Sequence, residues 1–113
     1  MIKKKRPLQN YITRVIEMKT NEELIKKVDK YESLTKQGLD EIKKKTTLTE
    51  KEEKIADDFL SMANNYYNDG KYYKEKGNLL TALASFSYAH AWLDAGVRAY
   101  LFDATNDQLF TLP

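Results

Sequence analysis

Apolar residues recur with helical spacing from the beginning of the chain. Leu8, Tyr11, Ile12, Val15 and Ile16 stand at i, i+3, i+4, i+7 and i+8, which places them on one face of a helix about three turns long. Because so short a helix is not stable by itself, we expect residues 8–18 to dock on the body of the protein, on a second copy or on another protein.

A second apolar stripe predicts a helix over about residues 21–45. Thr20 and Glu23 have the spacing of a capping box, which is typical of a helix start. Gly38 is expected to weaken or bend this helix. The stripe consists of Leu24, Val28, Tyr31, Leu34, Leu39 and Ile42.

Similar signals predict a helix over about residues 50–76. Thr49 and Glu52 form a second capping box, Gly77 suits the left-handed position that follows a helix, and Asn78 can cap the next helix. The apolar stripe of this helix consists of Ile55, Phe59, Met62, Ala63, Tyr66 and Tyr73.

The last long helix, about residues 79–102, is apolar or small on nearly every side. It contains six alanines, and its only charged residues are Asp94 and Arg98. A helix of this kind is surrounded by other helices. The sequence therefore predicts an all-α fold: an antiparallel three-helix bundle in residues 20–113, preceded in residues 1–19 by a basic leader and the short amphipathic helix.

Composition narrows the class of protein. The 113 residues suffice for one domain with its own core, and the lack of cysteine excludes disulfides and thiolate metal sites. No apolar run reaches the roughly 18 residues of a membrane span, and no signal-peptide pattern is present, so we expect a cytoplasmic protein with no membrane partner. Charge is uneven, because residues 1–54 carry 15 Lys/Arg and 10 Asp/Glu, whereas residues 55–113 carry 4 and 7.

The sequence contains no catalytic motif. It lacks a glycine-rich phosphate loop, a supported serine–histidine–aspartate grouping and a convergent set of metal ligands. We therefore expect no enzyme, no catalytic residue, no cofactor, no bound metal and no small-molecule substrate.

One polar stripe interrupts the apolar last helix. His90, Asp94 and Arg98 recur every four residues and can contact one another in sequence. One interpretation makes Arg98 an anion clamp with His90 as a titratable neighbour. We favour a structural brace, in which a partly buried Asp94–Arg98 ion pair fixes the helix register with Trp92 packed nearby, because buried charges are rarely left unpaired.

Tyrosines and the apolar C-terminus provide candidate contacts for a protein partner. In "YYNDGKYY", residues 66–73, helical periodicity places Tyr66 and Tyr73 inward and leaves Tyr67 and Tyr72 partly outward, where tyrosine is a common interface anchor. Plain packing in the bundle and stacking on the bases of a nucleic acid are the alternatives. The apolar end of the chain either packs back on the bundle or meets a partner. The candidate protein interface comprises Leu8, Tyr11, Ile12, Val15, Ile16, Tyr67, Tyr72, Leu109 and Phe110.

Basic residues in the N-terminal half give a second hypothesis about partners. They could support weak, sequence-independent contacts with the phosphates of a nucleic acid. The candidate phosphate contacts are Lys3, Lys4, Lys5, Arg6, Lys43, Lys44 and Lys45.

The segment "YYNDGKYYKEKGNLLTALASFSYAHAWLDAGVRAYLF" resembles the archaeal family known as domain of unknown function 357 (DUF357). The resemblance covers roughly residues 24–112 and is most specific in the alanine-rich "ALASFSYAHAWLDAGVRAYLF". It implies a compact three-helix bundle and an archaeal, cytoplasmic source, and it implies no activity. The helix at Leu8–Met18 and its basic leader look like an addition to the family core.

These observations favour a non-enzymatic helical protein–protein interaction module. Such a protein would be a small accessory subunit of a larger complex, or a homo-oligomer. The alternative is an accessory factor of nucleic-acid machinery, in DNA replication or translation, that makes weak phosphate contacts through its basic N-terminal half.

Overall fold

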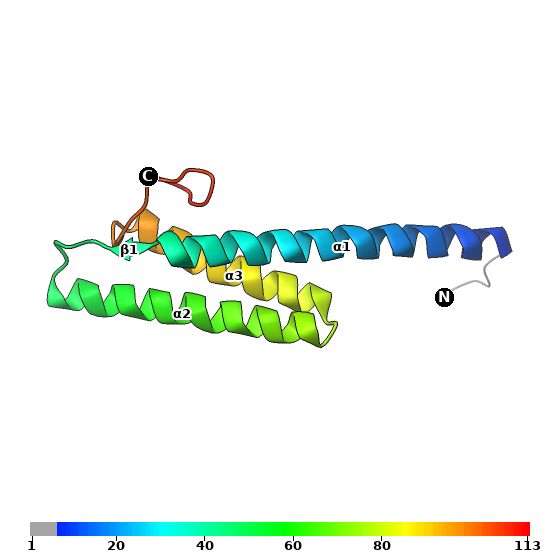
Figure 1. Cartoon of the computed structure of the whole chain (residues 1–113), viewed down its shortest axis with the longest axis horizontal. Helices are drawn as coiled ribbons and strands as arrows, with labels where there is room; N and C mark the ends of the chain where they lie inside the picture. The colour runs from blue at the N-terminus through cyan, green and yellow to red at the C-terminus, as the bar shows by residue number, and fades with distance from the viewer. Residues whose placement is uncertain (1–6) are drawn as a thin grey trace, which may run out of the picture.

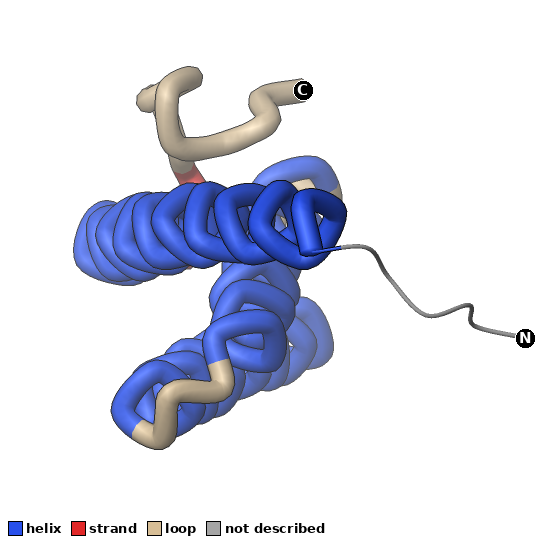
Figure 2. Tube along the Cα trace, turned by 90° about the vertical axis from the view of Figure 1, so that its right-hand side faces the viewer, coloured by secondary structure: helices blue, strands red, loops and turns tan. Residues whose placement is uncertain are grey.

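Three helices dominate the computed structural model, which describes the backbone of residues 7–113 and the side chains of residues 21–113. The elements are α1 (Pro7–Glu41), β1 (Lys43–Lys44), α2 (Glu50–Glu75), α3 (Leu79–Arg98) and β2 (Phe102–Asp103). Successive helices run in opposite directions (Figure 1), and α3 lies between α1 and α2, which contact each other little (Figure 2). The predicted all-α three-helix bundle is confirmed.

The first helix is longer than the sequence pattern indicates. Residues 8–18 do not form a separate short helix, because α1 is continuous from Pro7 to Glu41. The predicted capping box at Thr20 and Glu23 therefore lies inside a helix and does not begin one. No glycine or proline lies between Leu8 and Gln37, and extending a helix by one residue is far easier than starting a new one.

At its carboxyl end, α1 stops earlier than predicted. The helix ends at Glu41, and Lys43 and Lys44 pair antiparallel with Asp103 and Phe102 in a two-strand bridge. The Lys45 N–H also donates to the Leu101 carbonyl oxygen over 3.0 Å. These hydrogen bonds satisfy the backbone groups of residues 43–45. In a continued helix, the same groups would have bonded within the helix instead.

Both predicted caps of the α2–α3 hairpin are present. The Glu52 N–H donates to Thr49 Oγ1 (3.2 Å), and the Thr49 N–H donates to Glu52 Oε1 (2.9 Å), as a capping box requires. Gly77 follows α2 with a φ of 77°, in the left-handed region. Asn78 then caps α3, since its Oδ1 accepts from the Thr81 N–H over 3.4 Å.

The carboxyl end of α3 differs from the prediction, because the helix stops at Arg98 and Phe102 belongs to β2. Tyr100 adopts a φ of 60°, and the Leu101 N–H donates to the Gly96 carbonyl oxygen over 2.9 Å. This is a Schellman-type ending with tyrosine where glycine is usual. A left-handed tyrosine is uncommon. Because no glycine marks this helix end, the apolar pattern predicted a helix that continues past Arg98.

Small residues bring the helices close together in the core. Ala56 and Ala63 of α2 and Ala82 and Ala89 of α3 are fully buried. One apolar cluster is built around Leu93, Val97, Phe102, Leu109 and Phe110, and a smaller one around Val28, Ala82 and Phe86.

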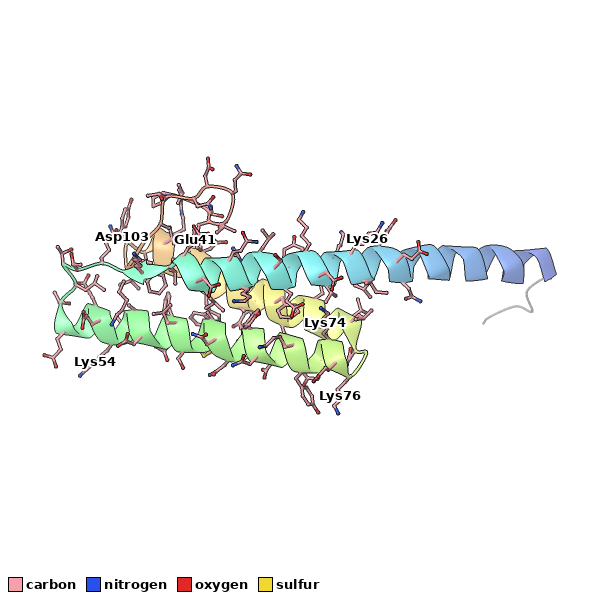
Figure 3. All side chains as sticks on the ribbon, in the orientation of Figure 1. Lys26, Glu41, Lys54, Lys74, Lys76 and Asp103 are labelled. Carbon is pink, nitrogen blue, oxygen red and sulfur yellow. The ribbon has the colours of Figure 1, made fainter. Side chains whose placement is uncertain are left out.

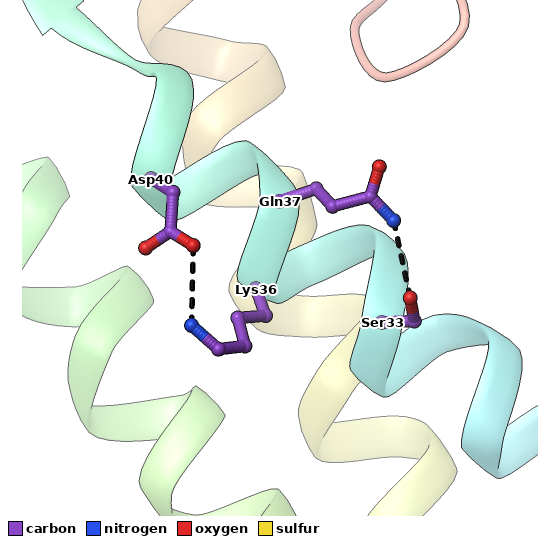
Figure 4. Close-up of polar contacts among 4 residues, drawn as sticks. All are labelled: Ser33, Lys36, Gln37 and Asp40. Atoms are coloured by element: carbon purple, nitrogen blue, oxygen red, sulfur yellow. Dashed lines mark hydrogen bonds and ion pairs between the residues drawn. The ribbon is translucent and has the colours of Figure 1, made fainter.

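Exposed polar pairs lie on two different sides of α1 (Figure 4). Lys36 donates to Asp40 over 3.1 Å, and the Gln37 amide donates to the Ser33 hydroxyl over 3.1 Å, both between residues four apart (Figure 4). Such exposed pairs between residues four apart contribute little to the stability of a helix.

The first turns of α1 extend past the α2–α3 hairpin. Asn21 and Leu24 line a shallow depression with residues 77–80 of the hairpin turn. The hairpin turn therefore lies beside residues 21–24 of α1. The α1 ribbon continues beyond that point through residues 7–20 (Figure 1). We refer to residues 7–20 as the N-terminal extension.

Candidate functional site

The polar stripe of α3 binds the C-terminal segment, residues 104–113, through its backbone. His90 Nε2 lies 2.5 Å from the Leu109 carbonyl oxygen, Asp94 Oδ1 accepts from the Thr111 N–H over 2.9 Å, and Arg98 donates to the Leu112 carbonyl oxygen over 2.9 Å. Successive turns of α3 therefore hold successive backbone groups of the same segment.

The predicted Asp94–Arg98 ion pair is not formed. The ion pairs of the described residues do not include one between these side chains. Each side chain instead meets a backbone group of opposite polarity. Arg98 is exposed and Asp94 is half-buried, so neither charge has to be neutralised by the other.

His90 connects three parts of the fold. A carbonyl oxygen can only accept, so Nε2 carries the hydrogen and donates to Leu109. Nδ1 lies 3.4 Å from the hydroxyl of Thr35 in α1, and that hydroxyl lies 3.2 Å from the Phe86 carbonyl oxygen. The imidazole also stacks against the Phe110 ring, with 6.0 Å between centroids.

Sequence reasoning missed Thr35, which is completely buried. It lies seven residues after Val28, at a position of the apolar stripe where a polar residue is unexpected. A threonine at an apolar position of the stripe indicates a buried hydroxyl, which must find a hydrogen-bond partner inside the bundle.

Trp92 does not belong to the polar stripe. Its ring makes edge contacts with Phe59 of α2 (5.0 Å) and with Tyr88 (6.0 Å), on the α2 side of α3. The indole Nε1 is buried without a hydrogen-bond partner. The predicted packing of Trp92 beside the stripe is therefore wrong.

Three of the residues predicted for a partner are used within the bundle. Leu109 and Phe110 are only 6% and 5% exposed and belong to the larger core cluster. Tyr67 packs against the Phe86 ring at 5.7 Å, and this burial raises the pKa of its hydroxyl. Tyr72 remains available, because it is 54% exposed.

Of the predicted phosphate contacts that the structure describes, two are engaged within the bundle. Lys44 is paired with Asp57 over 2.8 Å, which raises the pKa of Lys44, and Lys45 lies over the Tyr100 ring at 5.1 Å. Only Lys43 of the three is exposed. Lys3, Lys4, Lys5 and Arg6 lie outside the described residues.

Lys74 forms an ion-pair cluster that sequence reasoning also missed. Its Nζ lies 2.6 Å from Glu32 and 3.0 Å from Asp29, so α2 is joined to α1 (Figure 3). The pKa of Lys74 is raised, mainly by its hydrogen bond to Glu32 and second by its hydrogen bond to Asp29. Glu32 and Lys74 also line an open surface pocket of about 620 Å³ with Asn68, Lys71, Tyr72 and Glu75. The acidic and basic side chains in its lining are equal in number.

The remaining side of α3 is apolar and exposed. Leu80 and Tyr88 are 71% and 48% exposed. Tyr88 and Trp92 line a shallow pocket of about 210 Å³ with Ala91 and Ala95. We call Leu80, Ala84, Ser87, Tyr88, Ala91 and Ala95, all exposed, the outer face of α3.

The other predicted interface residues, Leu8, Tyr11, Ile12, Val15 and Ile16, fall in the N-terminal extension, and their side chains lie outside the description. Their backbone is helical as part of α1, so they share one face of that helix by their spacing. Residues 21–113 contain no group of three or more potential metal-ligating side chains. No helix among the described residues is long and apolar enough to cross a membrane.

Fold and site together define a small all-α protein, a three-helix bundle whose last helix holds the C-terminal segment by hydrogen bonds. The chain belongs to the family described as "Protein of unknown function (DUF357)", whose model matches residues 30–102. The resemblance predicted from the α2–α3 sequence is thereby confirmed, and the N-terminal extension lies before the matched region. No curated protein and no solved structure matches the chain.

Proposed function

We propose that this chain is a non-enzymatic helical interaction module that binds a protein through its N-terminal extension. The observation that carries the proposal is the course of α1, which continues past the α2–α3 hairpin (Figure 1). The sequence of this stretch has an apolar stripe with helical spacing. Among the described residues, no other helix runs beside this stretch. An amphipathic helix in that position is a common element for recognition by a groove or by another helix.

The rest of the molecule supports the same proposal. The polar side chains that could have bound a ligand, His90, Asp94 and Arg98, hold the C-terminal segment. The apolar end of the chain fills the core. The apolar stripe of the N-terminal extension is what remains of the predicted interface, together with the exposed ring of Tyr72.

The test compares two double variants of the full chain. Ile12→Glu with Val15→Glu places two charges on the apolar stripe, whereas Ser33→Glu with Gln37→Glu places the same two charges on an exposed side of α1. Sedimentation velocity measures self-association, and affinity purification from the native source identifies other partners.

We expect the first variant to weaken the observed association at least tenfold and the second to leave it unchanged. The proposal fails if the first variant binds like the original chain. It also fails if the original chain neither self-associates at micromolar concentration nor retains a partner.

A further inference from the structure

We propose that the outer face of α3 is the docking site for the N-terminal extension of a second copy of this chain. This inference rests on the proposed function and names the partner of the extension. It assigns a role to an exposed surface of which the internal packing of the bundle uses only part of Tyr88.

The outer face of α3 has the composition of a covered surface. Leu80, Ala84, Ser87, Tyr88, Ala91 and Ala95 carry no charge, although all are exposed. The other sides of α3 contact α2, α1 and the C-terminal segment. Small residues on a helix allow another helix to approach closely, so a helix fits this face better than an irregular peptide.

One residue that lines the pocket in this face, Trp92, has an unsatisfied polar group. Trp92 lines it with Tyr88, Ala91 and Ala95, and the Trp92 Nε1–H is buried without an acceptor. A buried donor without a partner destabilises the folded chain.

The N-terminal extension matches the face in length and in pattern. At a rise of about 1.5 Å per residue, residues 7–20 span roughly 20 Å, and the distance along α3 from Leu80 to Ala95 is roughly 22 Å. The stripe of five large apolar residues in the extension complements a face on which small residues leave room between Leu80 and Tyr88.

Charge favours the same pairing. Residues 1–20 carry six Lys/Arg and one Glu, whereas residues 55–113 have an excess of acid. Asp58 and Asp69 are exposed and share a side of α2 with Met62 and Tyr66 by their spacing. Tyr66 contacts Tyr88 with 4.5 Å between ring centroids, so these carboxylates flank the outer face of α3, where a basic helix would approach.

The direction of α1 indicates that the occupant is a second copy. Since α1 is continuous, it carries the extension away from the bundle and past the hairpin turn (Figure 1), where it cannot fold back on its own α3. α3 begins at the same end of the bundle. Two copies related by a two-fold axis could therefore each lay an extension along the other's α3. The two equal contacts double the buried area toward the roughly 1,200 Å² of the smaller specific interfaces.

Disulfide trapping tests the pairing directly, since the chain has no cysteine of its own. Isotope-labelled Ile12→Cys chain is mixed with unlabelled Ala91→Cys chain and oxidised, and mass spectrometry identifies the mixed dimer. Ser61→Cys, exposed on α2 and on the opposite side of that helix from Phe59, replaces Ala91→Cys in the control mixture. We expect at least tenfold more mixed dimer with Ala91→Cys than with Ser61→Cys.

A chain carrying both Ile12→Cys and Ala91→Cys shows whether the extension contacts α3 of a second copy or α3 of its own chain. Covalent dimers support docking on a second copy, whereas an intrachain disulfide in a monomer overturns it. Ala91→Glu should also raise the dimer dissociation constant at least tenfold without loss of helix content, because Ala91 is exposed, and Ser61→Glu should not.

The outcome distinguishes this inference from the proposed function. If Ile12→Glu with Val15→Glu abolishes association while Ala91→Glu has no effect and no mixed disulfide forms, the extension binds another surface. The inference is then wrong and the proposed function stands. If neither set of variants changes association, both are wrong.

Discussion

Three successive turns of α3 each present one polar side chain to the same stretch of backbone. His90 and Arg98 contact carbonyl oxygens and Asp94 accepts from an amide, so the order of the side chains matches the order of donors and acceptors in residues 109–112. The spacing in the sequence indicated that these side chains lie together. It could not show that their partners are backbone groups ten to twenty residues later, because backbone groups leave no trace in the sequence.

Asp94 is expected to contribute modestly to stability. Asp94→Ala removes one hydrogen bond to the C-terminal segment at a half-buried position, which should lower the free energy of unfolding by about 1 kcal/mol. A broken ion pair with Arg98 would have cost more. Asp94→Asn keeps an oxygen for the Thr111 N–H and should lose less than Asp94→Ala.

Thermal melts give the stability of both variants, and hydrogen exchange at the Thr111 amide gives the local effect. Faster exchange at Thr111 is expected in Asp94→Ala. Equal losses in the alanine and asparagine variants would show that the charge of Asp94 matters and the hydrogen bond does not.

Two glycines of the core should respond differently to alanine. At Gly96, an added Cβ would overlap the ring of Phe102, which is only 2% exposed and cannot move out of the way. We expect Gly96→Ala to destabilise the fold by about 1–3 kcal/mol, despite a gain in helix propensity of about 1 kcal/mol.

Gly38→Ala is the matched control for this prediction. Its added Cβ would lie 3.1 Å from Leu93 Cδ1, a side-chain atom that can give by a few tenths of an ångström. The propensity gain should offset this crowding, so we expect a change within about 1 kcal/mol in urea titrations. A Gly96→Ala chain as stable as the Gly38→Ala chain would contradict the close contact with Phe102.

At the scale of helices, the sequence predicted beginnings better than ends. Thr49 and Asn78 cap α2 and α3 as expected, because an N-cap depends on side chains within a few residues. The ends at Glu41 and Arg98 depend on the pairing of Lys43–Lys44 with Phe102–Asp103, a contact between distant segments. Thr20 shows the reverse error, since a capping pattern without a preceding helix breaker does not begin a helix.

The capping box of α2 predicts a pH dependence. Hydrogen bonds from the backbone N–H and the side chain of Thr49 hold the pKa of Glu52 below its usual value of 4.5. Since the pKa is lower in the folded state, the carboxylate stabilises the fold above pH 4.5. This stabilisation is lost as the pH falls through the folded-state pKa.

Glu52→Gln should therefore narrow the difference between the melting temperatures at pH 7 and pH 3. Glu53→Gln removes a charge from the same turn without this capping bond and serves as the control. An NMR titration midpoint for Glu52 at or above 4.5 would contradict the prediction.

At the scale of the molecule, the two ends of the chain play different parts. The C-terminal segment lies on the bundle and contributes Leu109 and Phe110 to the core. The N-terminal extension lengthens the molecule to 65 Å along its longest axis. The sequence predicted a separate role for residues 8–18 from their stripe, but it could not show that they continue α1. That continuity is what carries the backbone of residues 7–20 away from the bundle (Figure 1).

This contrast makes opposite predictions for two deletions. Among the described residues, the core clusters begin at Leu24 and the depression at the hairpin turn begins at Asn21, so removal of residues 1–18 leaves both in place. We expect the shortened chain to keep its helix content per residue and its cooperative unfolding, with a melting temperature within a few degrees of the original. Its association should be lost.

Removal of residues 104–113 is the matched deletion at the other end. It takes Leu109 and Phe110 out of the core and leaves His90 and Asp94 without their backbone partners. Loss of a large buried side chain typically costs about 2–5 kcal/mol, so this deletion should lower the melting temperature strongly or abolish folding. Circular dichroism and calorimetry on both chains decide the matter: if the chain lacking residues 1–18 unfolds without cooperativity, the extension is part of the core and cannot be a free binding element.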